Sequence, residues 1–153
     1  MPLPSAVRKI VVSEGDSPRY IEGECDTAIS IGAACELNAD GKYDAWAGTA
    51  GSKDEVIICV EQSLIGETVN DGAATPAPAT TTADTQIKMF IPKPGDVCHI
   101  LVLASEDITV GDLLTRAATA GKFIEVGSEA QFDFKALETL TSASDFYIKA
   151  RRL

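Results

Sequence analysis

Residues 87–103 read IKMFIPKPGDVCHILVL and contain two apolar runs of strand length separated by a turn. In the first run, Ile87, Met89 and Ile91 occupy alternate positions, so they share one face of a predicted strand. In the second run almost every position is apolar, which indicates a strand covered on both faces. The prolines and the glycine between the runs end the first strand. The stretch therefore favours a sheet over a helix.

The rest of the chain is organised in the same way on both sides of this stretch. Further strands are predicted at 56–60, 113–118, 123–126 and 145–149, and turns at 38–42 and 120–122. Residues 132–140 alternate as a strand, although Phe134, Leu137 and Leu140 also have helical spacing, and we favour the strand. The sequence therefore predicts an all-β fold with at most short helical turns.

Length and composition predict one globular domain. The chain has 153 residues, of which 45% are hydrophobic and 24% charged, which is enough apolar material for one core. Residues 1–12 form an N-terminal arm or a first strand, and residues 13–153 a single β domain. Residues 66–85, rich in Pro, Ala and Thr, offer little to bury and are predicted to protrude as a long loop.

The net charge excludes one class of partner. With 13 basic and 23 acidic residues, the formal charge is −10, and phosphates repel such a surface, so we expect no nucleic-acid partner. No run of about eighteen apolar residues is present, and the start does not read as a secretory signal, so we expect no membrane partner. Lys149, Arg151 and Arg152 concentrate positive charge at the end, either for local ion pairing or as outward-facing residues of a terminal strand.

The cysteines predict buried thiols rather than a metal site. Cys25, Cys35, Cys59 and Cys98 form no C-x-x-C pair, and without a secretory signal we expect them to be reduced. Three of them, all but Cys25, lie in apolar runs and read as small buried hydrophobic residues. A zinc site would need these cysteines and His99 to come together from distant strands, so no metal ligand is predicted.

Catalytic motifs are poorly represented. His99 is the only histidine and lies in an apolar run, where a hydrogen-bonded core or interface histidine is expected rather than a general base. No G-x-S-x-G motif is present, and residues 48–53 lack the Gly-Lys-Ser/Thr order of a phosphate loop. We therefore predict that the protein is not an enzyme and has no catalytic residues.

Two partial motifs for bound groups are better explained as turns. Residues 36–41 mimic the first half of a calcium loop, but Ala47 stands where its bidentate glutamate is expected. Residues 108–114 resemble a turn of biotinyl and lipoyl carriers, and Lys122 follows a glycine in a hairpin, but the flanking pattern of those carriers is missing. We therefore predict no cofactor and no bound metal.

The order of these motifs carries a family resemblance that covers most of the chain after Ala33. The segments concerned are 36–42, 46–49, 56–61, 91–97, 108–114, 121–123, 136–140 and 148–153. In this order they resemble the small head-decoration, or cement, proteins of tailed bacteriophages. Each segment is a β-turn motif of low specificity, so the resemblance rests on their order.

The resemblance implies a β-barrel-like or β-tulip-like domain that forms a homotrimer. It also implies binding to the major capsid protein on the outer surface of an icosahedral virion, between capsomers, after synthesis in the bacterial cytoplasm. The long Pro/Ala/Thr loop does not match the family, so the sequence leaves the trimer interface unknown. Other readings are a cytoplasmic β-barrel that binds a ligand or acts as a carrier, and another virion subunit associated with tail or fibre.

The N-terminal arm supplies the predicted capsid-binding residues. An extended arm can add to the edge of a neighbouring sheet through main-chain hydrogen bonds, and prolines near the start keep it extended. The alternative is that residues 7–12 are an internal strand and only residues 1–5 fray. The residues assigned to capsid binding are Pro2, Leu3, Pro4, Val7, Ile10 and Val12.

Overall fold

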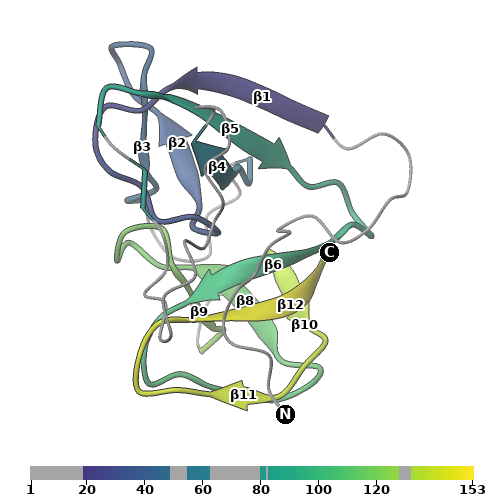
Figure 1. Cartoon of the computed structure of the whole chain (residues 1–153). Helices are drawn as coiled ribbons and strands as arrows, with labels where there is room; N and C mark the ends of the chain where they lie inside the picture. The colour runs from purple at the N-terminus through teal and green to yellow at the C-terminus, as the bar shows by residue number, and fades with distance from the viewer. Residues whose placement is uncertain (1–18, 49–54, 63–79, 82, 128–131) are drawn as a thin grey trace.

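The computed structural model describes residues 19–48, 55–62, 80–81, 83–127 and 132–153, and all regular structure in these ranges is β (Figure 1). The strands are β1 (Arg19–Glu24), β2 (Cys35–Leu37), β3 (Tyr43–Ala45), β4 (Ile58–Gln62), β5 (Gln86–Ile91), β6 (Val97–Val102), β7 (Asp107–Ile108), β8 (Leu113–Arg116), β9 (Phe123–Glu125), β10 (Phe134–Ala136), β11 (Leu140–Thr141) and β12 (Phe146–Arg152). The predicted all-β class is confirmed.

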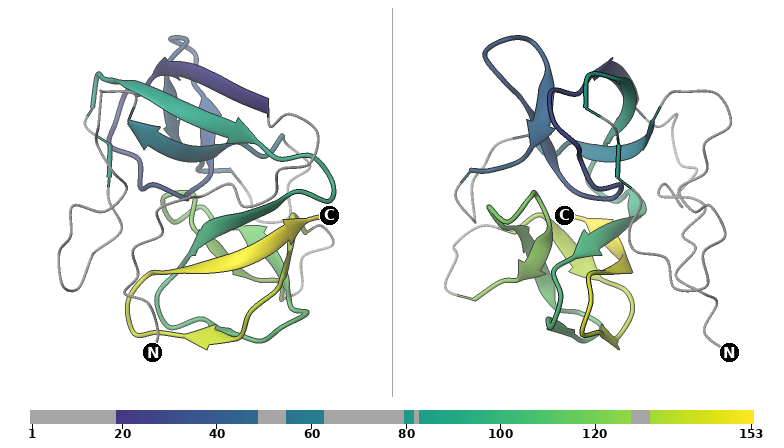
Figure 2. Two further views of the ribbon diagram at one scale, coloured as in Figure 1. Left: turned by 45° about the vertical axis from the view of Figure 1, so that its right-hand side comes forward. Right: turned by 60° about the vertical axis from the view of Figure 1, so that its left-hand side comes forward.

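The strands form two groups that follow one another along the chain. The N-terminal sheets consist of a three-stranded sheet, β1-β5-β4, and the antiparallel hairpin β2–β3. The C-terminal strands close a five-stranded barrel in the order β10-β12-β6-β9-β8, and β7 and β11 form a two-stranded ribbon. Figures 1 and 2 show the N-terminal sheets above the barrel and β11 at the far end of the barrel. A small β-barrel was expected and is present.

Strand β6, within the apolar run 97–103, lies between the barrel core and the N-terminal part of the chain. Ile100 and Val102 belong to the main hydrophobic core, and Leu101 between them is also fully buried. The backbone N–H of Leu101 donates to the carbonyl of Gly32 at 3.0 Å, so the N-terminal part of the chain meets β6 directly. The barrel core and this junction together bury both faces at residues 100–102, whereas Val97 and His99 on the outward side of the strand are only half-buried, so the prediction holds for the second half of the strand.

Side-chain caps hold the two turns that the sequence predicted most clearly. In the turn at 92–96, the Lys93 N–H donates to Asp96 Oδ2 at 2.8 Å, and the Asp96 N–H donates to the Lys93 carbonyl at 3.0 Å. In the β2–β3 hairpin, Asn38 Oδ1 accepts from the backbone N–H groups of Asp40 and Lys42, both at 3.0 Å. An aspartate or asparagine that bonds to the nearby backbone is a typical turn signal, and both turns are confirmed.

The ambiguous segment 132–140 is extended rather than helical. Strand β10 covers only three of its residues, with Phe134 and Ala136 buried and the residue between them exposed. The inward alternation does not continue beyond this strand, because Phe132 and Leu140 are exposed. The preference for a strand is confirmed, but the single apolar face expected along the whole segment is much shorter.

The interior of the barrel is filled by side chains. Phe123 and Phe134 pack edge to face with their ring centroids 5.4 Å apart, and both are fully buried. The same hydrophobic cluster continues through Trp46 and Phe90 into the N-terminal sheets. One core therefore joins the two groups of strands.

Only the end of the predicted loop 66–85 falls within the described residues. Thr81 is buried there, and its backbone N–H donates to the carbonyl of Ile29 at 2.8 Å, while its hydroxyl accepts from the Ile29 N–H at 2.9 Å. The end of the segment is thus attached to the N-terminal sheets. Residues 66–79 and the arm 1–12 lie outside the described residues, so the protruding loop and the arm stay predictions.

Candidate interaction surfaces

The residues predicted to bind the capsid cannot be placed on a surface. Pro2, Leu3, Pro4, Val7, Ile10 and Val12 all lie outside the described residues. Their role stays a prediction.

A junction segment, residues 31–34, connects the barrel to the N-terminal sheets through its backbone. The Gly32 N–H donates to the carbonyl of Cys59 in β4 at 2.8 Å, and the Gly32 carbonyl accepts from Leu101 in β6. The Ala34 N–H donates to the carbonyl of Gly121 at 2.9 Å. Because the backbone of this segment bonds to both groups, the segment fixes their relative position.

Tyr147 of β12 reinforces this junction. Its hydroxyl donates to the carbonyl of Ile31 at 2.7 Å, and burial raises the pKa of Tyr147 well above its usual value. A Cβ added to Gly32 would lie 2.6 Å from the Tyr147 ring, so the ring packs directly on the glycine backbone. Tyr147 therefore acts as a structural side chain within the molecule.

A buried arginine joins three further segments. The Arg116 side chain is 1% exposed, and its Nε donates to Asp133 Oδ2 at 2.9 Å. One terminal nitrogen donates to the carbonyl of Glu55 at 3.2 Å, and the guanidinium lies 4.7 Å from the centre of the Trp46 ring. Such a group is sealed from solvent, so it stabilises the fold rather than binding a partner. The sequence analysis missed it because arginine is ordinarily an exposed residue.

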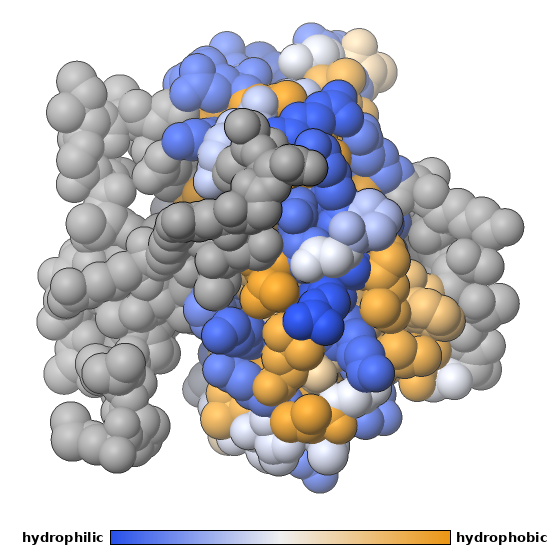
Figure 3. All heavy atoms as spheres, turned by 90° about the vertical axis from the view of Figure 1, so that its right-hand side faces the viewer, coloured by the Kyte–Doolittle hydropathy of each residue, from blue (hydrophilic) through white to orange (hydrophobic). Residues whose placement is uncertain are grey.

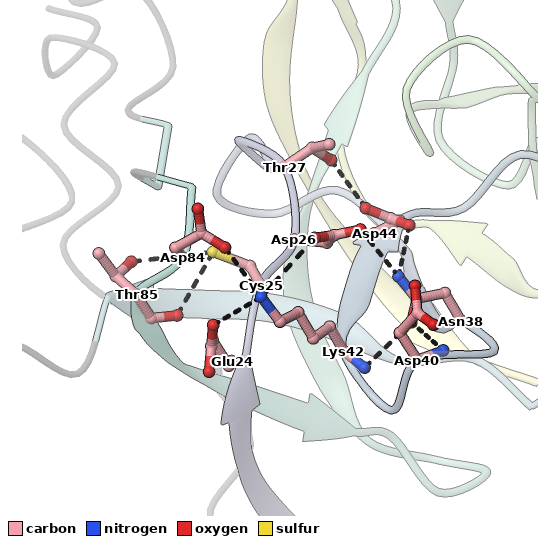
Figure 4. A network of polar contacts seen from close by, with 10 residues as sticks. All are labelled: Glu24, Cys25, Asp26, Thr27, Asn38, Asp40, Lys42, Asp44, Asp84 and Thr85. Carbon is pink, nitrogen blue, oxygen red and sulfur yellow. Dashed lines mark hydrogen bonds and ion pairs between the residues drawn. The ribbon is translucent and has the colours of Figure 1, made fainter.

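An acidic network surrounds Lys42 at the turn of the β2–β3 hairpin (Figure 4). The Lys42 ammonium lies 2.8 Å from Glu24, 2.9 Å from Asp84 and 3.8 Å from Asp26. Hydrogen bonds to Glu24 and Asp84 raise the pKa of Lys42 above its usual value. One ammonium therefore serves three carboxylates, which leaves the network negatively charged.

Asn38 and Thr27 hold the remaining carboxylates of this network in place. The Asn38 amide donates to Asp26 at 3.2 Å and to Asp44 at 3.0 Å, and the Thr27 hydroxyl donates to Asp44 at 2.9 Å (Figure 4). The segment that mimics a calcium loop is the hairpin turn that the sequence favoured. No group of three or more potential metal ligands occurs among the residues that the structure describes.

The four cysteines are buried thiols. Burial is the main cause that raises the pKa of Cys59 and of Cys98 to about 12, and it also raises the pKa of Cys35. Cys25 accepts or donates a bond with Thr81 at 3.6 Å inside the core. The reading of the cysteines as small buried hydrophobic residues is confirmed.

Two residues that could have carried chemistry lie in structural settings. Lys122 forms an ion pair with Asp145 at 2.7 Å, and its side chain is 18% exposed, unlike the exposed lysine that a carrier domain requires. His99 lies on the outward face of β6, half-buried and directly opposite Lys149 of β12.

No helix within the described ranges is long and apolar enough to cross a membrane.

The outer side of β10, β12 and β6 presents a basic face. Lys135 of β10 lies directly opposite Arg151 of β12, and Lys149 lies opposite His99. Their side chains point outward because the residues between them in each strand, Phe134 and Ala150 among them, are buried. We define the basic face as Lys135, Lys149, Arg151 and His99.

The basic C-terminal stretch forms no ion pair with any described residue, so the reading as local ion pairing is not supported, whereas the outward-facing reading applies to part of it. Arg152 bonds locally, since one of its terminal nitrogens donates to the carbonyls of Asp133 at 2.8 Å and Leu153 at 2.9 Å. Lys149 and Arg151 face outward from a terminal strand. The sequence analysis missed Lys135, because only the pairing of β10 with β12 brings it beside them.

Exposed apolar side chains of the described residues lie in several groups on the face seen in Figure 3. On the side seen in Figure 3, hydrophilic residues predominate in the upper part and apolar residues form separate groups, mainly lower down. The large apolar residues exposed within the described ranges are Tyr20, Leu37, Val110, Phe132, Leu140 and Leu153. Exposed apolar residues are normal on a protein surface and do not by themselves define a site.

Comparison with known proteins gives a likeness to a solved structure. No family model matches the chain, and no curated protein matches it. Among solved structures, the chain is similar to the N base of head fiber gp8.5 of bacteriophage phi29. The TM-score is 0.46 at 12% sequence identity, with 90% of this chain and 98% of that chain covered. A similarity at this level supports no statement about function.

Proposed function

We propose that this chain is a structural virion protein that binds the outside of an icosahedral phage capsid and stabilises it between capsomers. The observation that carries the proposal is the ordered series of turn motifs that resembles head-decoration proteins. The turns at 38–42, 92–96 and 120–122 lie between the strands of one continuous all-β unit. The segments that carry the resemblance therefore follow one another within a single β structure.

The polar interior fits a structural role. Tyr147 connects β12 to the junction segment, and Arg116 connects β8 to the segment before β10 and to the backbone before β4. These contacts join strands and loops far apart in the sequence. A protein that braces a shell benefits from such cross-links, because local opening of a strand would release its contacts with the shell.

The proposed partners are the major capsid protein and two further copies of the chain. Many copies on one shell multiply a modest interface through avidity. A net charge of −10 fits the outer surface of the virion, since such a surface is not attracted to the packaged DNA. The proposal includes synthesis in the bacterial cytoplasm and binding to the outer surface of the shell.

The barrel interior disfavours the reading as a ligand-binding or carrier barrel. Phe123 and Phe134 occupy the centre together with Ile100 and Ile148, and all four are fully buried. The candidate carrier lysine, Lys122, is held by Asp145. A tail- or fibre-associated subunit shares the structural role and is distinguished by its copy number and its position on the particle.

Quantitative mass spectrometry of purified virions tests the proposal. We expect a copy number close to that of the shell subunits, and labelled particles should show the protein over the head. A few copies located at the tail or at fibres would instead identify the tail- or fibre-associated subunit. If the protein is missing from purified particles, the virion role is wrong.

Two N-terminal deletions test the capsid-binding arm. One variant lacks residues 1–6 and the other lacks residues 1–12, and both are mixed with undecorated shells and sedimented. If the arm binds the shell, both variants keep a β-type circular dichroism spectrum but no longer sediment with shells. If the short deletion binds normally and the long one fails to fold, residues 7–12 are a core strand and the arm has no capsid role.

A further inference from the structure

Acidic residues are unevenly distributed between the two groups of strands. Among the described residues before position 97, ten are acidic and four are basic. From position 97 onward seven are acidic and six are basic. The excess of negative charge therefore belongs to the N-terminal sheets, and the barrel is close to neutral.

Three cations of the basic face nevertheless lack an acidic partner among the described residues. Lys135, Lys149 and Arg151 make no side-chain ion pair with any described residue. Glu138, three residues after Lys135, accepts the backbone N–H of Lys149 at 3.1 Å and forms no ion pair with its ammonium. By contrast, the buried guanidinium of Arg116 is matched with a carboxylate.

This arrangement costs stability within the monomer. Lys135 and Arg151 lie directly opposite each other on neighbouring strands, and like charges in that position are destabilising. Lys149 lies two residues from Arg151, on the same side of β12, which adds a third positive charge to the same face. Repulsion among these three cations destabilises the monomer, so an acidic partner surface that binds them would relieve it.

The molecule carries a complementary surface of its own. We define the acidic end as Glu22, Glu24, Asp26, Asp40 and Asp84, which lie on β1, on the segment after it, on the β2–β3 turn and just before β5. Most are exposed, and one ammonium, that of Lys42, serves three of them (Figure 4). Hydrogen bonds fix Asp26 within the network, so the negative charges are held in position.

We propose that the basic face binds the acidic end of a second copy of the chain. The contact is head to tail, because it joins two different patches, and such contacts close into a ring when the rotation allows. This contact identifies the two surfaces that would meet in the proposed homotrimer. Only the number of subunits, three, rests on the proposed function. Complementary charges of this kind set the orientation and the rate of association more than its strength.

Charge reversal on each side tests the contact. The basic-reversed variant combines Lys135→Glu, Lys149→Glu and Arg151→Glu, and the acid-reversed variant combines Glu22→Lys and Asp40→Lys. Sedimentation velocity of the full chain at low salt measures self-association. We expect the association constant of each variant to be at least about tenfold lower than that of the natural chain, because like charges then face each other.

Mixing the two variants gives the decisive readout. The acidic end kept by the basic-reversed variant complements the basic face kept by the acid-reversed variant, and the two reversed surfaces also complement each other. An equimolar mixture should therefore regain association with alternating subunits. An odd-numbered ring cannot alternate, so the mixture should not reproduce the natural trimer. The matched control, Arg19→Glu, reverses a cation outside the basic face and should leave association intact.

A single substitution separates a structural role from a binding role. Lys135→Glu turns a like-charge pair with Arg151 into an opposite-charge pair, so the melting temperature of the monomer should rise while self-association weakens. High salt should weaken association of the natural chain, because screening shortens the range of the charges to about 3 Å at 1 M salt. Association that is insensitive to both salt and charge reversal overturns the proposal.

Shell binding is measured on the same variants and distinguishes the failures. If the natural chain is monomeric at low salt but the basic-reversed variant no longer binds shells, the basic face meets the shell and the second-copy proposal is wrong. If the chain self-associates as expected but never binds shells, the proposed virion function fails and the contact stands.

Discussion

Gly121, in the β8–β9 hairpin, lies directly against the backbone of Ala34. The Ala34 N–H donates to the Gly121 carbonyl at 2.9 Å, and a Cβ added to Gly121 would collide with the Ala34 carbonyl oxygen. Gly121 also has φ of +69°, a conformation that favours glycine. Two requirements therefore coincide at the point where the barrel meets the junction segment.

Gly121→Ala should destabilise the protein strongly. The left-handed conformation costs an alanine about 1–2 kcal/mol, and the collision with a backbone group adds roughly 1–3 kcal/mol. Gly41→Ala is a matched control, because Gly41 has φ of +79° but nothing within 4 Å of its Cβ position. Urea denaturation should show a clearly larger loss at Gly121, and equal losses would mean that the contact with Ala34 contributes little.

The buried pair of Arg116 and Asp133 should be costly to break on one side only. Arg116→Met leaves the Asp133 carboxylate buried without its partner, and we expect the free energy of unfolding to fall by about 3–5 kcal/mol. Adding Asp133→Leu should recover part of this loss, because no charge is then left unpaired. A double variant as unstable as the sum of the single variants would contradict this account.

The exposed pair of Arg19 and Glu55 provides the comparison for that prediction. Their side chains are 58% and 56% exposed and lie 3.4 Å apart. Water and salt screen such a pair, so Arg19→Ala should cost no more than about 1 kcal/mol in the same denaturation experiment.

Stability should fall in alkaline solution. Burial raises the pKa of Cys59 and of Cys98 from 9.0 to about 12, so the folded protein keeps protons that the unfolded chain releases. The stabilisation is complete below pH 9 and is lost as the pH rises through 12, at about 1.4 kcal/mol per pH unit for each thiol. Cys98→Ala should reduce the slope of the free energy of unfolding against pH by the equivalent of about one proton. An unchanged slope would show that Cys98 does not contribute to the loss of stability.

The buried thiols should also be chemically inert in the native state. Cys25, Cys35, Cys59 and Cys98 are buried, so a thiol reagent at neutral pH should modify them only after the protein unfolds. The extent of thiol modification is measured from the absorbance of the reagent's product, with and without denaturant. Rapid modification of one cysteine in the native protein would show that its surroundings open locally.

Some features could be predicted because they depend on a few consecutive residues. The turns at 38–42 and 92–96 follow from the bonding of Asn38 and Asp96 to backbone groups two to four residues away. The strand at 97–102, covered on both faces at residues 100–102, follows from a run that is apolar at every position except His99. The same local reasoning favoured an extended segment over a helix at 132–140.

The basic face illustrates where local reasoning ends. Lys149 and Arg151 stood out in the sequence because they are close together in it. Lys135 did not, since it becomes their neighbour only through the register of β10 against β12. That register depends on which residues of a three-residue strand meet the barrel core, and a shift by one residue would turn Lys135 to the other face.

The sequence by itself determined the fold class and the turns, because alternation and turn chemistry act over a few residues. Only the tertiary structure decided that Arg116 is buried, that Gly121 meets Ala34, and that the chain closes a barrel beneath a separate sheet. Each of these depends on pairs of residues far apart in the chain. Their contact becomes favourable only after the core has brought the strands together, so neither partner reveals it in the sequence.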